Sequence, residues 1–413
     1  MFSKILSSSF GINFIKKCFT ILSGIIFLVL MTRFLGPSLR GEYAYIMNYV
    51  NIFATIFNLG ISLVMPSYLR NKKDFTVDDF ISLSIYQFIF NLFLVFIFYL
   101  ATGNLMVITI LFLSSISILS LQLNNITLVT DIKLNSVSFI ISSIVNIILI
   151  VFVYFFLDVK LYYIILVYLT KESVLILSNI VRIRFKFLKF RKKWFLILKT
   201  AFLPMLTTSL IAINYRVDVV MLENYKIEFF LIGLFSTGVA LSEYSWLVTD
   251  IFKEVMLNKN TKRDEINLTS LSIRFAFTSV LAFAIGFSIL GKFILNIMFG
   301  KEFIPAYYVT LSMLLAVPFM GFVKIIGTLF ITQGKWIKYF YILLLTVLIN
   351  ILLNMVLIPV LGIFGSALAS IFSYMFCGLR CLFWYSKKYN ISVLKLFIIN
   401  KSDISVFTSY FKK

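Results

Sequence analysis

The sequence predicts an all-α polytopic membrane protein of about 12 transmembrane helices in two six-helix lobes, with both termini cytoplasmic. Of its 413 residues, 61% are hydrophobic and 13% are charged. A soluble domain of average composition has about 45–50% apolar and about 25% charged residues. A chain this apolar cannot cover its own surface with polar groups, which excludes a water-soluble globule. The second observation is that Lys and Arg gather in alternate loops, which predicts the orientation.

Twelve apolar runs are long enough to cross a bilayer, because a spanning helix needs roughly 20 mostly apolar residues. Each run ends at charged residues or at Gly and Pro. They are residues 10–34, 43–66, 80–101, 105–129, 134–157, 161–181, 199–222, 229–252, 269–291, 305–331, 336–357 and 362–385. No small-residue cleavage site follows the first run, so we interpret it as a retained helix and not as a signal peptide.

Basic residues indicate the orientation and the boundary between the lobes. With the N-terminus inside, cytoplasmic segments carry 26 of the 38 Lys and Arg residues and external loops carry 6. The densest basic segment, 182–198, contains no acidic residue and is predicted to be a cytoplasmic linker between lobes at 1–181 and 199–385. We expect it to contact anionic lipid headgroups and not nucleic acid. The segment 386–413 is a basic tail predicted to lie along the cytoplasmic surface.

Composition also limits the chemistry. The sequence contains no histidine, which excludes His-based metal sites and Ser-His or Cys-His nucleophile pairs. Its three cysteines, Cys18, Cys377 and Cys381, lie in apolar runs and are interpreted as packing residues. No predicted loop is long enough for a catalytic domain. We therefore predict a protein that is not an enzyme and that has no metal or organic cofactor.

Ionisable residues near the middle of spans mark the candidate site, because a charge at the bilayer centre costs about 2.5–3.5 kcal/mol on insertion scales. Lys171 and Glu172 in the sixth span and Glu243 in the eighth are too deep to reach water easily. Either they form buried ion pairs between helices or they line a hydrated cavity. Adjacent residues on a helix point about 100° apart, so Lys171 and Glu172 are each expected to pair with another helix. Asp250 lies on the same face as Glu243, near the cytoplasmic end, where it could simply be solvated.

Other charges lie nearer to the ends of the spans. Arg216 in the seventh span and Lys324 in the tenth lie about 10 Å from an end, where snorkelling and a functional role both remain open. Asp218 lies about 200° around the helix from Arg216, so the two should contact different neighbours. Arg274 and Arg380 lie near cytoplasmic ends and are expected to snorkel.

Amides and prolines interrupt several spans. Asn350 and Asn354 in the eleventh span either form interhelical hydrogen bonds or line a cavity that contacts sugar hydroxyls. Pro204 and Pro318 are expected to kink the seventh and tenth spans.

Five segments, in order along the chain, carry recognisable motifs. Residues 31–45 read MTRFLGPSLRGEYAY, residues 215–222 read YRVDVVML, and Leu241-Ser242-Glu243 is followed by Trp246. Residues 299–306 read FGKEFIPA, and residues 358–369 read IPVLGIFGSALA. These segments resemble motifs of Wzx-type O-antigen and polysaccharide flippases, members of the MOP (multidrug/oligosaccharidyl-lipid/polysaccharide) exporter superfamily. Glu223 departs from the pattern, since the family more often has Gly there.

The resemblance implies a flippase that moves undecaprenyl-pyrophosphate-linked O-antigen repeat units from the cytoplasmic to the periplasmic leaflet of the bacterial inner membrane by alternating access. Its partners would be the lipid-linked oligosaccharide, membrane lipids and other membrane proteins of polysaccharide assembly. An anionic pyrophosphate needs a wet cavity with cationic groups, for which the candidates are Lys171, Arg216, Lys324 and Arg33. Arg33 could equally stabilise the Gly-Pro turn. The acidic candidates, which would orient those cations or carry a coupling H⁺ or Na⁺, are Glu172, Asp218 and Glu243.

Three alternatives remain. A MATE-like exporter of cationic drugs shares the superfamily architecture but should have a mainly acidic cavity, whereas the deep charges here are mixed. A membrane glycosyltransferase or O-antigen polymerase would have a long external loop, which the sequence does not predict. A channel would need a repeated filter motif, and none is apparent.

Overall fold

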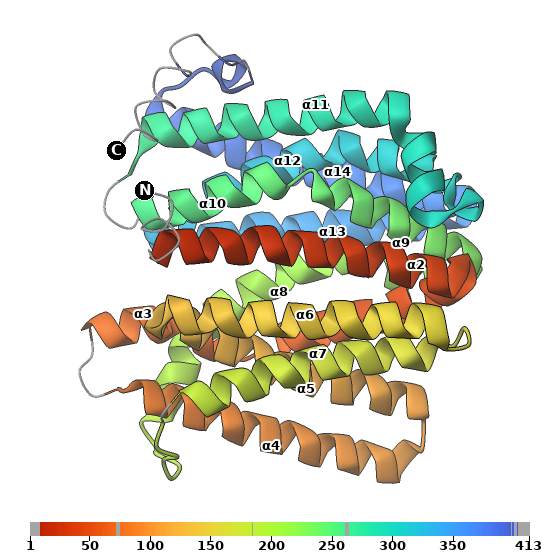
Figure 1. Cartoon of the computed structure of the whole chain (residues 1–413). Helices are drawn as coiled ribbons and strands as arrows, with labels where there is room; N and C mark the ends of the chain where they lie inside the picture. Colours follow the sequence, from red (N-terminus) through yellow and green to blue (C-terminus); the bar gives the residue numbers. More distant parts are fainter. Residues whose placement is uncertain are drawn as a thin grey trace. The chain divides into compact units, whose positions relative to one another are not determined.

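The computed structural model describes residues 9–71, 75–183, 185–260, 264–397, 399 and 403. These residues are almost entirely helical and contain no strand (Figure 1). In chain order the helices are α2 (Ser9–Ile56), α3 (Ile61–Asn71), α4 (Val77–Thr102), α5 (Leu105–Thr130), α6 (Ile132–Phe156), α7 (Leu161–Arg182), α8 (Trp194–Asn224), α9 (Phe229–Tyr244), α10 (Leu247–Asn260), α11 (Ile266–Phe299), α12 (Ala306–Thr332), α13 (Trp336–Leu361) and α14 (Ile363–Tyr389), with 3₁₀ turns η1 (Lys301–Phe303) and η2 (Val393–Leu396).

Within the described residues, ten helical stretches are long and apolar enough to cross a membrane, and α9 with α10 forms an eleventh candidate bent by 52°. The first stretch, Phe19–Leu69, has 51 residues. At 1.5 Å per residue it would extend for about 77 Å, more than twice the roughly 30 Å hydrocarbon core. It therefore holds two spans. The predicted class, an all-α multi-pass membrane protein, is confirmed.

Two backbone breaks divide that first stretch. Gly36 has φ 65° and ψ 175°, and Pro37 follows it, so α2 changes direction at the Leu-Gly-Pro motif. A second break at residues 57–60 separates α2 from α3, with Leu59 and Gly60 at positive φ. A Cβ on Gly60 would lie 2.9 Å from the Ala201 carbonyl oxygen of α8. The prediction of one uninterrupted span at 43–66 is therefore wrong, because close packing on α8 requires this turn.

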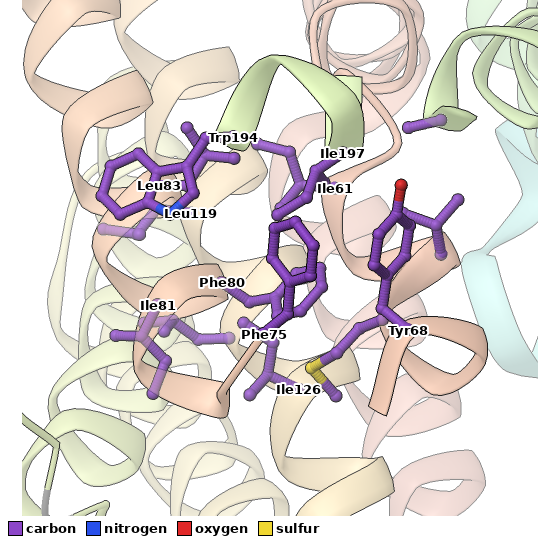
Figure 2. Close-up of a cluster of buried hydrophobic side chains, with 14 of the residues drawn as sticks. Ile61, Tyr68, Phe75, Phe80, Ile81, Leu83, Leu119, Ile126, Trp194 and Ile197 are labelled. Carbon is purple, nitrogen blue, oxygen red and sulfur yellow. The ribbon is translucent and has the colours of Figure 1, made fainter. Parts of the chain in front are cut away.

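The chain divides into two compact units, Met1–Ala212 and Ile213–Lys413, with the division inside α8. The first unit has a core in which Trp194 and Ile197 of α8 pack among side chains of α3, α4 and α5 (Figure 2). Buried Asp79 accepts a hydrogen bond from Trp194 Nε1 at 2.8 Å. Arg191 and Lys193 lie 3.4 and 3.5 Å from the same carboxylate. Two basic residues of the linker thus pair with a buried carboxylate of the protein.

In the second unit, α12 is the most buried of the candidate spans, because 78% of an apolar 18-residue stretch of this helix is buried inside the protein. It continues as one helix through Pro318, as α8 does through Pro204. The turn between α13 and α14 uses Gly362 at φ 57°, and a Cβ on Gly365 would lie 2.2 Å from the Leu357 carbonyl oxygen. Only glycine fits there, which accounts for the Gly-x-x-Gly spacing of this motif.

Cysteine and tail predictions have mixed outcomes. Cys377 and Cys381 are free and buried, as expected of packing residues; the side chain of Cys18 lies outside the described residues.

Arg274 does not snorkel: its Nε donates to Asp403 at 2.8 Å, and its Nη1 donates to the Lys395 carbonyl at 3.2 Å. A bidentate carboxylate in the tail is a better partner than headgroups at the surface. Most of the tail beyond residue 397 lies outside the described residues.

Candidate transport site

In the first unit, the deep charges form a pair on one helix. Lys171 Nζ lies 3.2 Å from Glu172 Oε1. The expectation that these two neighbours would not pair is therefore wrong. Adjacent positions on a helix point about 100° apart, but the flexible side chain of lysine can bend around the helix surface. Its ammonium therefore reaches the neighbouring carboxylate. The other oxygen of Glu172 does find a partner on another helix, accepting a hydrogen bond from Ser120 of α5.

An aromatic side chain supports this pair. Lys171 Nζ lies 5.9 Å from the centre of the Tyr168 ring, one turn earlier on α7. The Tyr168 hydroxyl in turn makes a 2.8 Å hydrogen bond with Ser117 of α5. The Lys171 side chain keeps 32% of its surface exposed and Glu172 keeps 12%. The ammonium is thus held by α7 and remains accessible.

In the second unit, the predicted eighth span is broken. The helix ends at Tyr244 and resumes at Leu247, with a 52° bend. No proline causes this bend. Ser245 and Trp246 instead form tight turns, with their amides donating to Ser242 and Glu243, and the Trp246 indole donating to the Val317 carbonyl at 2.8 Å. The break ends α9 immediately after Glu243.

Arg216 of α8 contacts this broken end. Its Nη1 lies 3.8 Å from Glu243 Oε1, and the two side chains remain 34% and 25% exposed. Glu243 therefore has an interhelical partner, one of the two interpretations left open. The distance is at the long end for an ion pair, so the guanidinium retains donors for a further acceptor.

Lys324 lies in the interior and does not snorkel. Its Nζ lies 2.8 Å from Asp250 Oδ1 and 4.1 Å from the centre of the Trp246 ring, and its side chain is 15% exposed. Asp250 keeps 44% of its side-chain surface exposed and in addition pairs with Lys324, because the bend between α9 and α10 brings its carboxylate to α12. The same bend places Glu243 and Asp250 on different helices.

Aromatic rings join these charges into one cluster within the second unit. The Trp246 ring packs 5.4 Å from Tyr215, which packs 5.9 Å from Tyr374 of α14. Tyr215 and Arg216 come from the seventh-span motif, whereas Glu243 and Trp246 come from the eighth-span motif. The structure thus brings two segments recognised separately in the sequence into direct contact.

Asp218 belongs to a different network. It is 3% exposed and accepts hydrogen bonds from Ser370 of α14 and from Asn354 of α13, the latter at 2.9 Å. Asn354 also donates to Asn350, which donates to Ser373. As expected, Asp218 and Arg216 contact different neighbours. No Lys or Arg of the described residues lies within ion-pair distance of Asp218, so a buried carboxylate is held by neutral donors alone.

Several buried polar atoms near this network have no partner among the described residues. Asn214 lies one turn before Asp218 on α8, is fully buried and has neither amide atom hydrogen-bonded. Asn354 Oδ1 and Ser366 Oγ are also without a partner. Unpartnered buried oxygens around a carboxylate could accept a small cation or a proton-carrying water. The described residues hold no group of three or more His, Cys, Asp or Glu placed to bind a metal ion.

Arg33 differs from the other cationic candidates. It lies three residues before the break at Gly36, with its side chain exposed. This location suits either role considered for it, because an arginine beside the turn can stabilise the loop and still contact an anion.

Sequence reasoning missed three parts of these clusters. The pairing of Asp250 with Lys324 was not predicted, and Tyr215 and Trp246 were noted only as motif letters. The signal was present in the tenth span, since a buried Lys324 requires a counter-charge and an aromatic ring is a common second partner.

The fold is that of an all-α multi-pass membrane protein, and it is shared with several solved membrane transporters. Among solved structures, the chain is similar to the lipid II flippase MurJ in an inward closed conformation, with 20% identity, a TM-score of 0.72, and coverage of 97% of this chain and 92% of that one. It is also similar to an inward-facing multidrug resistance MATE transporter of the MOP superfamily, with 12% identity, a TM-score of 0.66, and coverage of 91% and 95%.

A MATE transporter from Vibrio cholerae is a third similar structure, with 13% identity, a TM-score of 0.63, and coverage of 95% and 99%. No protein-family profile matches the sequence, and no curated protein matches it. At these identities the similarity establishes the shared fold.

Proposed function

We propose that this protein is a flippase that moves undecaprenyl-pyrophosphate-linked O-antigen repeat units from the cytoplasmic to the periplasmic leaflet of the bacterial inner membrane. Alternating access would expose the site first to one side and then to the other. The fold shared with a lipid II flippase supports this proposal, and so does the resemblance of the sequence to Wzx-type motifs.

The main supporting observation is the accessible charge deep in the spans. Arg216 and Lys171 each keep about a third of their side-chain surface exposed although they lie within apolar helices. An ionised group in hydrocarbon is costly, so such surface should contact water or an anion. An arginine with free donors is suited to a pyrophosphate, because its planar fork binds two oxygens at once.

The mixed charge favours an anionic substrate over a cationic drug. Each deep carboxylate other than Asp218 is already paired with a cation, at Lys171, Arg216 or Lys324. A cationic drug would have to compete with these lysines and the arginine for the carboxylates. A pyrophosphate instead brings negative charge, which the lysines and the arginine attract. A MATE-like antiporter therefore remains the second candidate.

Asp218 is the best candidate for coupling. No Lys or Arg of the described residues pairs with it, it lies among amide and hydroxyl groups, and it is next to oxygens that have no partner in that part of the chain. A hard cation such as Na⁺ prefers this kind of oxygen site, and a proton would neutralise the buried carboxylate equally well. Comparing transport in sodium gradients and in proton gradients separates the two ions.

The test is complementation of a strain that lacks its O-antigen flippase. We expect the wild type to restore surface O-antigen, and Arg216→Gln and Lys171→Gln to impair it at equal protein level. Lys189→Gln, in the exposed basic linker, is the matched control and should complement fully. Normal O-antigen display by both site variants would refute their role.

Two further assays test the alternatives. Drug resistance on overexpression, without a glycan phenotype, would favour the MATE-like antiporter. Formation of glycosidic bonds by the purified protein from lipid-linked sugars would favour a glycosyltransferase or polymerase. A flippase should give neither result.

A further inference from the structure

A basic pocket lies between the start of α13 and the end of α14. Its volume is 510 Å³. Four of its lining side chains are basic and lie toward the start of α13 or the end of α14; we call them the mouth: Lys338, Arg380, Lys387 and Lys388. Its other lining side chains are apolar or aromatic: Tyr341, Ile342, Leu345, Phe376, Phe383 and Trp384. The lining thus combines cationic and apolar side chains, and the pocket belongs entirely to the second unit.

The positive charge at the mouth exceeds the negative charge nearby. Among the described residues, Asp264 is the acidic partner of Lys388, at 3.8 Å, and no carboxylate lies within 4 Å of Lys338, Arg380 or Lys387. Desolvation and the neighbouring Lys388 ammonium lower the pKa of Lys335, one turn from Lys338. The mouth therefore carries a net positive field that an anion would neutralise.

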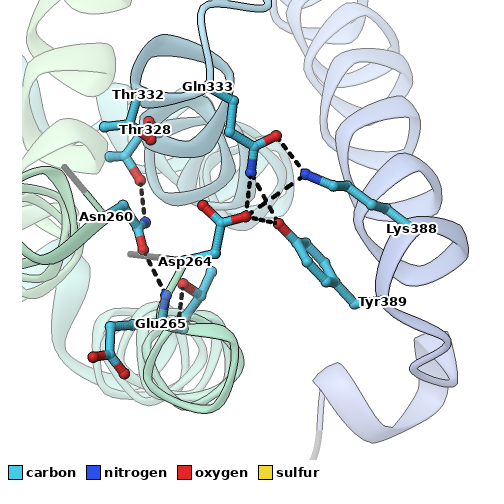
Figure 3. A network of polar contacts seen from close by, with 9 residues as sticks. Asn260, Asp264, Glu265, Thr328, Thr332, Gln333, Lys388 and Tyr389 are labelled. Atoms are coloured by element: carbon cyan, nitrogen blue, oxygen red, sulfur yellow. Dashed lines mark hydrogen bonds and ion pairs between the residues drawn. The ribbon is translucent and has the colours of Figure 1, made fainter. Parts of the chain in front are cut away.

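The edge of the pocket is fixed by a polar network. Lys388 donates to Gln333, which itself donates to Asp264 at 2.7 Å (Figure 3). The Tyr389 hydroxyl donates to the same Asp264 carboxylate at 2.8 Å. These contacts hold the ends of α12 and α14 together, so Lys388 is positioned before any ligand arrives.

Trp384 lies beside the basic side chains of the mouth. Its ring stacks on Phe330 at 4.1 Å, and the ammonium groups of Lys335, Lys338 and Lys388 lie 5.2–5.9 Å from its centre. Three cations around one indole repel one another, and a bound anion would relieve that repulsion. Indole rings are also typical of the membrane–water interface, where headgroups lie.

An apolar stripe continues from the pocket along α13. Tyr341, Leu345, Leu348 and Leu352 lie at helical spacing on one face, and each is 46–60% exposed. Such a stripe is costly in water and neutral in lipid. A ligand that contacts both the mouth and the stripe must have an anionic head and a hydrocarbon chain.

We propose that this pocket binds one anionic phospholipid of the surrounding bilayer, with its phosphate among Lys338, Arg380, Lys387 and Lys388 and an acyl chain along Tyr341, Leu345 and Leu348. Basic pockets between helix ends are typical sites for anionic headgroups. This gives Arg380 a binding role where the sequence predicted only snorkelling. The site does not depend on which molecule the protein transports.

The test uses native mass spectrometry of the full-length protein in detergent, titrated with dioleoyl phosphatidylglycerol and, separately, with dioleoyl phosphatidylcholine. The wild type should retain one phosphatidylglycerol tightly and show no such preference for phosphatidylcholine. The variant Lys338→Gln/Arg380→Gln/Lys387→Gln should lose on the order of 100-fold in affinity for phosphatidylglycerol. All three side chains are exposed, so thermal stability without lipid should be unchanged.

The matched control is Lys186→Gln/Lys189→Gln/Lys192→Gln, which removes the same charge from the exposed linker. It should bind phosphatidylglycerol like the wild type. Equal loss in both triple variants would overturn the proposal, because it would indicate diffuse attraction by net charge. Displacement of the lipid by an equal concentration of inorganic phosphate would also overturn it, since the acyl chain would then add nothing.

Discussion

The two units hold their deep charges in different ways. In the first unit, Lys171 and Glu172 are neighbours on α7 and need only Ser120 of α5 to complete their contacts. In the second unit, Arg216 and Glu243 come from α8 and α9, and the pair of Lys324 and Asp250 comes from α12 and α10. One arrangement is local to a helix, whereas the other depends on how four helices pack.

This difference predicts which unit responds to a bound ion or substrate. A pair within one helix moves with that helix and keeps its geometry when neighbouring helices shift. A pair between helices is broken or formed by the same shift, so its energy differs between conformations. The second unit also holds Asp218, a buried carboxylate that no Lys or Arg of the described part of the chain pairs with. We therefore expect conformational coupling to depend more on the second unit than on the first.

The largest expected effect on the rate of transport is that of Asp218→Asn in the second unit. It removes the charge of a buried carboxylate that, among the described residues, is held by neutral donors, and transport should fall on the order of 100-fold, because a neutral amide cannot bind the coupling ion. Glu172→Gln in the first unit should reduce transport about tenfold or less, since Glu172 already has the Lys171 ammonium as its partner. The measurement is the initial rate of lipid-linked oligosaccharide translocation in proteoliposomes at matched protein density.

The control for that prediction is the thermal stability of both variants in detergent. A greater loss of rate in Glu172→Gln than in Asp218→Asn, with both proteins intact, would contradict the assignment of coupling to the second unit.

A smaller effect is expected from breaking the pair between α12 and α10. Lys324→Gln should lower the free energy of unfolding by about 1 kcal/mol, because the Asp250 carboxylate that loses its charged partner is 44% exposed and can be solvated by water. The double variant Lys324→Gln/Asp250→Asn should recover part of that loss, which gives a coupling energy between the two positions. Lys171→Gln, removing the more exposed lysine, should cost less than about 1 kcal/mol.

Thermal denaturation in detergent provides these values. Additive losses in the double variant, with no recovery, would mean that the 2.8 Å contact between Lys324 and Asp250 contributes nothing to stability.

The sequence predicted the helical class and the apolar runs, because a span is defined by its own composition. It did not predict the breaks at residues 57–60 and 245–246, since neither contains proline and both arise from packing on other helices. The turn at Gly36 was signalled by its Gly-Pro pair. Local composition thus determined the spans, and tertiary contacts determined where they bend.

The same distinction holds for the candidate site. The depth of Arg216, Glu243 and Lys324 was predicted from position along each span. Their partners were not, because a pairing between helices depends on rotation and on bends that one sequence does not reveal. Asp250 shows this well: a straight eighth span would keep it on one face with Glu243, whereas the 52° bend moves it to Lys324.

The smallest side-chain changes are made by a matched pair of serine variants, which test the comparison most closely. Ser370→Ala and Ser120→Ala each remove one hydroxyl that donates to a carboxylate, at Asp218 and Glu172 respectively. Ser370→Ala should cost about 2 kcal/mol of unfolding free energy, since no Lys or Arg of the described residues pairs with buried Asp218, and Ser120→Ala less than about 1 kcal/mol. In Ser120→Ala the Glu172 carboxylate keeps the Lys171 ammonium at 3.2 Å, and this ion pair offsets most of the free energy lost with the hydrogen bond. Equal losses in the two variants would show that the local pair on α7 stabilises its carboxylate no better than neutral donors do.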